Sequence, residues 1–231
     1  MVQNLMDNTY SHSLDVSKYF KLTYLYMVLG IATTGIGSVI GGVFFGSLVA
    51  QLFQSNLALI GLIAIQFALV FVVARLSESQ NKAIALSGYL GFTVFEGLIL
   101  SPVLLITNPK TLIAAFVSTV GLFGIMAILG YTTKIDMSRF GGILLAATFA
   151  LFLAMIVNVF IGSGLFGYIV SGIAVIVFAL WTAYDNQKLR IAFETADETN
   201  ANSIAVMGAF SLYIDFLNMF ISLLRIFSNN D

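Results

Sequence analysis

Seven long apolar segments, separated by short polar connections, form the hydrophobic pattern of this chain. A helix needs about 20 mainly apolar residues to cross the hydrocarbon layer of a bilayer. Lipid offers no partner to unpaired backbone groups, so we expect every span to be an α-helix. The predicted spans are residues 22–47, 57–76, 82–106, 111–133, 141–161, 165–187 and 203–227.

These spans form one predicted membrane domain, residues 22–227, between a polar N-terminal tail (1–21) and a short C-terminal tail (228–231). Most connections are only a few residues long. The sixth, from Lys188 to Asn202, is long and acidic enough to predict a mobile loop. We find no internal repeat, so the pattern does not favour an inverted-repeat transporter.

Composition agrees with an all-α integral membrane protein. Of the 231 residues, 59% are hydrophobic and 9% are charged, whereas about a quarter of the residues in soluble domains are charged. The chain has no cysteine and a single histidine, His12 in the tail, which excludes thiol chemistry, a histidine metal cluster and a Ser-His triad. A net charge of −1 without basic runs does not favour nucleic acid as a partner, and without a phosphate-binding loop we expect no cofactor.

Positive charge predicts the orientation of the spans, because lysine and arginine gather on the cytoplasmic side. The tail and every second connection contain eight of the ten basic residues, and the opposite side contains Lys110 and Arg225. We therefore expect a cytoplasmic N-terminus and a C-terminus on the far side. The eight are Lys18, Lys21, Arg75, Lys82, Lys134, Arg139, Lys188 and Arg190.

A polar stripe follows one side of the seventh predicted span. Its members recur every three or four residues, which places them on one helix face: Gly208, Ser211, Asp215, Asn218, Ser222 and Arg225. Small residues and hydroxyls commonly line interfaces between membrane helices. A carboxyl group in lipid costs several kcal/mol by most estimates and marks a functional site by default. Asp215 therefore points beyond simple packing.

Two further charged residues, Asp185 and Arg75, end the sixth and second predicted spans near the cytoplasmic face. Asp185 can meet Asp215 only if the seventh helix begins in the cytoplasm or the sixth helix continues past Asp185. Apolar residues favour that continuation: Leu189, Ile191 and Phe193. Alternatively, Arg75 and Asp185 are interfacial charges that face lipid headgroups.

Two carboxyl groups that meet share a proton and titrate as a coupled unit. When both protons are lost, the carboxylates repel each other and offer the hard oxygen ligands that Ca²⁺ prefers. Ca²⁺ takes six to eight oxygens, so Asp185 and Asp215 would form only weak, transient metal contacts. That behaviour suits a pore. A nearby Arg75 would hold one carboxylate and act as a latch.

Glu96 lies midway along the third predicted span. It is interpreted either as a second proton-accepting group on a permeation route or as a protonated packing residue bonded to Thr93 or Tyr89. Together with Glu96, three members of the polar stripe are candidates to line the route of an ion: Ser211, Asn218 and Ser222.

Two motifs resemble the Bax inhibitor family of membrane proteins. The run from Ser211 to Phe227 resembles the last-helix signature of that family, and Tyr184-Asp185-Asn-Gln-Lys188 resembles its sixth-helix motif. The resemblance implies six helices arranged around a central seventh. It also implies that Asp185 and Asp215 form a pH sensor for a Ca²⁺ leak, with Arg75 of the second helix bonded to the pair.

The leading functional hypothesis is a pH-sensitive cation leak, most of all for Ca²⁺, in a bacterial inner membrane, with no enzymatic activity. The family resemblance also implies an alternative, a stress-response regulator or adaptor that binds a membrane protease or another membrane protein. A third alternative is an intramembrane aspartyl protease, which uses two carboxyl groups that share a proton. The second motif of such proteases has glycines before its aspartate, where this chain has Leu212-Tyr213-Ile214.

Overall fold

The computed structural model describes residues 16–77, 81–197 and 200–228, and His12 lies outside these ranges. Regular structure in the described residues is helical, and seven of the helices are long and apolar enough to cross a membrane. This confirms the predicted all-α, seven-span class. The helices are α2 (Val16–Phe53), α3 (Asn56–Ser77), α4 (Lys82–Ile106), α5 (Pro109–Thr132), the short 3₁₀ helix η1 (Met137–Phe140), α6 (Gly141–Ile161), α7 (Gly164–Glu194) and α8 (Ala201–Ser228).

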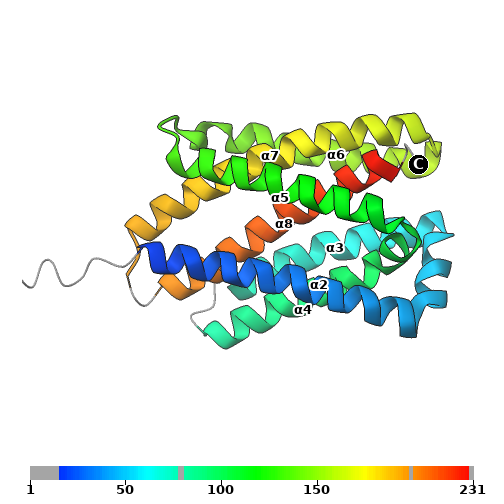
Figure 1. Ribbon diagram of the computed structural model, residues 1–231, viewed down its shortest axis with the longest axis horizontal. Coiled ribbons are helices and arrows are strands. Elements are labelled where there is room, and N and C mark those ends of the chain that lie inside the picture. The colour runs from blue at the N-terminus through cyan, green and yellow to red at the C-terminus, as the bar shows by residue number, and fades with distance from the viewer. Residues whose placement is uncertain (1–15, 78–80, 198–199, 229–231) are drawn as a thin grey trace, which may run out of the picture.

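Helix α8 runs obliquely between two groups of helices (Figure 1). Helices α2, α3 and α4 pack on one another, and α5 and α6 each pack on α7. Helix α8 contacts α2, α3, α4, α5 and α7, and 67% of its most apolar window is buried, against at most 39% in any other span. Helix α6 packs mainly on α7. The arrangement of all six other helices around α8 therefore stays a prediction.

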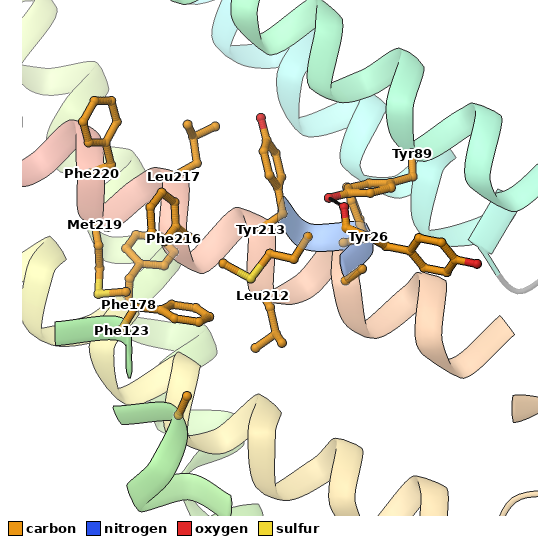
Figure 2. Close-up of a cluster of buried hydrophobic side chains, with 14 of the residues drawn as sticks. Tyr26, Tyr89, Phe123, Phe178, Leu212, Tyr213, Phe216, Leu217, Met219 and Phe220 are labelled. Atoms are coloured by element: carbon orange, nitrogen blue, oxygen red, sulfur yellow. Dashed lines mark hydrogen bonds between the residues drawn. The ribbon is translucent and has the colours of Figure 1, made fainter. Parts of the chain in front are cut away.

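Apolar side chains project from opposite sides of α8 (Figure 2). In the close-up, Tyr213, Leu217 and Phe220 extend to one side, whereas Leu212 and Met219 extend to the other. All five are buried. The two sides of α8 therefore face different partners.

The sixth connection is shorter than the sequence predicts. Helix α7 continues to Glu194, so the residues from Lys188 onward are helical and the prediction of a loop from Lys188 to Asn202 was wrong over that part. The reason is apolar burial, because Leu189 and Phe193 lie in the core. Helix α2 likewise begins at Val16, inside the segment expected to be a polar tail. Its Tyr19 ring stacks on Phe193 at a centroid distance of 5.9 Å.

Glycines allow α2 and α4 to touch backbone to backbone. A Cβ placed on Gly97 would collide with the carbonyl oxygen of Thr34, and one on Gly37 would collide with the carbonyl oxygen of Val94. Neither carbonyl can move without shifting its helix. Small residues permit such approach between membrane helices, where van der Waals packing drives association.

We predict that Gly97→Ala destabilises the protein by about 1–3 kcal/mol, the usual cost of overpacking a well-packed interior. The control is Gly91→Ala on the same helix, where the added methyl group would meet open space. Thermal unfolding in detergent should show a lower midpoint for Gly97→Ala and an unchanged or higher midpoint for Gly91→Ala. Equal midpoints would contradict the close contact.

Candidate functional site

Asp185 of α7 and Asp215 of α8 meet inside the bundle. Their carboxyl groups interact electrostatically, and the hydroxyl of Ser211 donates a hydrogen bond to Asp185. Asp215 is 4% exposed and Asp185 is half-buried. Helix α7 continues past Asp185. It therefore packs against α8 both before and after the aspartate pair, which allows the two side chains to approach each other.

Asp215 carries a buried oxygen that is left without a hydrogen bond. Its Oδ2 atom is fully covered and accepts no hydrogen bond from any residue in the described ranges. An unsatisfied buried polar atom costs about 1–3 kcal/mol, and more when it is charged. Packing does not require such a group. The unsatisfied atom is instead suited to binding a proton or cation at this position.

The polar stripe of α8 faces α7 at several levels. A Cβ on Gly208 would collide with the side chain of Leu189. Ser211 forms a hydrogen bond with Asp185, and Asp215 interacts with Asp185 electrostatically. Further along, the guanidinium of Arg225 lies 3.4 Å from the position that a Cβ on Gly167 would take. The α7–α8 interface therefore contains the stripe that the spacing of polar residues predicts.

Within the stripe, Asn218 and Ser222 do not contact the aspartates through any hydrogen bond found in the described residues. The Asn218 amide donates to the carbonyl of Ile214 on its own helix at 2.8 Å. Ser222 is 5% exposed. Both residues lie further along the same interface, so their assignment to an ion route stays a prediction.

The residues next to Asp185 fix α7 to other elements. Asn186 is fully buried and accepts a hydrogen bond of 2.5 Å from the hydroxyl of Tyr24 in α2. Gln187 donates to the carbonyl of Ile135 at 2.8 Å and accepts from the amide of Met137 at 2.7 Å. Neither role follows from the sequence, in which the one signal is that Asn186 and Gln187 stand inside the sixth-helix motif.

Trp181 and Tyr184 complete this part of α7. Their rings meet edge to face with centroids 5.1 Å apart, and the indole N–H of Trp181 donates to the Thr148 hydroxyl of α6 at 2.9 Å. A Cβ on Gly141 would lie 3.0 Å from the Tyr184 hydroxyl. The segment from Trp181 to Gln187 thus contacts α2, α6, α8 and the α5–α6 connection.

Arg75 lies in the last turn of α3 and is exposed. The positive charge that acts on the Asp185 carboxyl is that of Lys188, one helical turn away on α7. The assignment of Arg75 as the latch arginine therefore stays a prediction, and Lys188 is a basic neighbour of Asp185.

Glu96 is 5% exposed in α4 and accepts a hydrogen bond of 3.0 Å from Gln66 of α3. The predicted partners were wrong: the Tyr89 hydroxyl donates to the Tyr26 carbonyl, and Thr93 bonds within α4 and to α2. Glu96 also acts electrostatically on Tyr213. Since Tyr213 and Asp215 are two residues apart, they project from nearly opposite faces of α8. The structure therefore does not place Glu96 with the aspartate pair.

The pair offers few ligands for a metal. No group of three or more histidine, cysteine, aspartate or glutamate side chains that could hold a metal ion occurs among the described residues. Two carboxylates supply fewer than the six to eight oxygens that Ca²⁺ takes. The two carboxylates alone therefore do not complete a Ca²⁺ site.

Comparison with known proteins identifies the family. Residues 16–231 match the family described as Inhibitor of apoptosis-promoting Bax1. The chain belongs to the Bax inhibitor family. The match covers every described helix and both residues of the aspartate pair.

Three bacterial proteins are similar to this chain over most of their length. It is 36% identical over 214 residues to the inner membrane protein YbhL of Escherichia coli K12, covering 90% of this chain and 92% of YbhL. It is 35% identical over 223 residues to an uncharacterized protein of Deinococcus radiodurans, covering 94% and 92%. An uncharacterized membrane protein of Streptococcus pyogenes serotype M1 is 32% identical over 217 residues, covering 94% of both chains.

We predict that Gln187→Ala loosens the α5–α6 connection, because it removes two hydrogen bonds worth about 1 kcal/mol each. Hydrogen–deuterium exchange of residues 133–140 should become several-fold faster. The control is Gln51→Ala, which changes an exposed glutamine at the end of α2. Unchanged exchange in the Gln187 variant would show that the two bonds do not hold the connection.

Proposed function

We propose that this protein is a pH-sensitive cation leak, most of all for Ca²⁺, in which protonation of the Asp185–Asp215 pair favours the closed state. The observation that supports the proposal is the electrostatic coupling of two carboxyl groups from α7 and α8, one of which has a buried oxygen without a hydrogen bond. No part of the proposed role requires enzymatic chemistry or a resident cofactor.

The physical basis of gating is the charge of the pair. With one shared proton, the carboxyl groups attract each other and hold α7 against α8. When that proton is lost, two like charges face each other in a poorly solvated site, and their repulsion favours separation of the helices. The freed carboxylates then attract a cation. Loss of the proton thus both opens the interface and creates the attraction for Ca²⁺.

We propose that the ion follows the α7–α8 interface, past Ser211, Asn218 and Ser222. Glu96 lies across α8 from the pair and is proposed as a separate proton-accepting group, held by Gln66. The name of the Escherichia coli relative supports a location in the inner membrane of a bacterium. The bias of basic residues supports a cytoplasmic N-terminus, with the C-terminus on the far side.

We predict that purified protein in dye-loaded liposomes conducts Ca²⁺ with a flux that rises between about pH 5 and pH 8. Asp185→Asn and Asp215→Asn should remove this dependence on pH, because an amide does not titrate. Glu194→Gln is a matched control, since Glu194 is an exposed carboxylate on the same helix as Asp185. It should retain the wild-type profile.

Two results would contradict the leak. A pH profile in Asp215→Asn that matches wild type would show that the pair is not the sensor. Flux no greater than that of empty liposomes at every pH would favour instead the membrane regulator that binds a protease or another membrane protein.

We further predict that Lys188→Gln shifts the midpoint of the flux profile to higher pH. Removal of a positive charge favours the protonated pair, so opening then requires a lower proton concentration. An exposed charge pair contributes about 0.2–1 kcal/mol, which corresponds to a shift of roughly half a pH unit. Arg75→Gln, measured beside it, tests the latch arginine: a larger shift than that of Lys188→Gln would assign the role to Arg75.

A further inference from the structure

An apolar cavity of about 300 Å³ lies on the other side of α8 from the aspartate pair. Side chains of α2, α4, α5 and α8 line it. Its inner wall consists of buried residues, namely Thr34, Leu100, Tyr213, Phe216, Leu217 and Phe220. In Figure 2, Tyr213, Leu217 and Phe220 project together from α8 on this side.

The cavity opens sideways, between α2 and α5. Its rim includes Gly35, Ile113 and Phe116, which are all exposed. Among the described residues, α2 and α5 have little backbone contact, and the ring contact of Phe20 with Tyr131 lies far along α5 from Phe116. A Cβ on Gly35 would meet open space, so no side chain covers the mouth at Gly35.

The lining leaves no polar group for water to bind. The two hydroxyls in the wall, those of Thr34 and Tyr213, lie 2.6 Å apart and bond to each other. A cavity with such a lining stays dry, and an apolar cavity of about half this volume is large enough to take up benzene. An apolar guest therefore fits better than water or an ion.

The surroundings decide what kind of apolar guest reaches it. Every lining residue lies in a membrane-spanning helix, and the rim continues into exposed apolar residues of the same two helices, such as Ile36 and Val117. The mouth therefore faces the hydrocarbon of the bilayer. An acyl chain is the guest that this environment supplies.

We propose that this cavity is a binding site for one acyl chain of a membrane phospholipid. Lys110 supports a lipid orientation in which the headgroup lies at the start of α5, because this lysine is exposed there, one turn before Ile113 of the rim. Lysine side chains at helix ends reach the headgroup layer. The phosphate of the lipid then lies near Lys110, while one chain enters between α2 and α5 and rests on α8. The site is independent of the proposed ion leak.

The test is photocrosslinking in vesicles of phosphatidylethanolamine and phosphatidylglycerol that contain a small fraction of phosphatidylethanolamine with a diazirine on one acyl chain. After illumination, mass spectrometry locates the adducts. Phe216 and Phe220 are 4% and 8% exposed, so lipid that only surrounds the protein cannot reach them. We expect adducts on these two residues as well as on lipid-facing residues of α6, such as Ile143 and Leu153.

A matched pair of variants tests the entry point. Gly35→Phe places a ring in the mouth and should reduce adducts on Phe216 and Phe220 several-fold, with α6 labelling unchanged. Gly46→Phe is the control on the same helix, because its added atoms also begin in open space, and it should leave both sets unchanged. Labelling of α6 reports in each sample that the protein is folded in the bilayer.

Two outcomes would overturn the proposal. Adducts confined to α6 and other lipid-facing residues in wild-type protein would show that no acyl chain enters the cavity. Adducts on Phe216 and Phe220 that persist at wild-type levels in Gly35→Phe would show that the lipid does not enter between α2 and α5. Neither outcome depends on Ca²⁺ flux, so failure of the proposed leak remains distinguishable.

Discussion

The inability of lipid to solvate a carboxyl group governs much of this structure. Asp215 must find its partners inside the bundle, and α7 supplies Asp185 for that purpose. The meeting requires α7 and α8 to run together beyond the predicted end of the sixth span, which brings Leu189 and Phe193 into the core. The position of α8, the length of α7 and the contact between α7 and α2 are all linked to this aspartate pair.

The remaining helices fix that pair through close contacts rather than through charge. Asn186 and Gln187 flank Asp185 on α7 and bond to α2 and to the α5–α6 connection. Glycines bring α2, the helix that contains Tyr24, into backbone contact with α4. The proposed separation of the pair by like charge would therefore take place within a frame that holds α7 to its neighbours.

The sequence predicts the spans well because apolar length is a local property of the chain. It also shows that Asp185 can meet the polar stripe if the sixth helix continues past it, which Leu189 and Phe193 favour, but it leaves open that Asp185 faces lipid headgroups. Long-range partners are a different matter. The bonds of Glu96 to Gln66 and of Tyr24 to Asn186 depend on how helices rotate against each other, and no local pattern encodes that rotation. The cavity beside α8 also depends on how α2 and α5 are placed, so the sequence does not predict it.

The chain contains one tryptophan, and it stands one turn from Asp185. Its indole bonds to Thr148 of α6 and its ring packs against Tyr184. Indole emission depends on the polarity and hydrogen bonding of its surroundings, so the fluorescence of Trp181 follows the α6–α7 contact optically. The protein therefore carries an intrinsic optical reporter beside its aspartate pair, with no dye or added label.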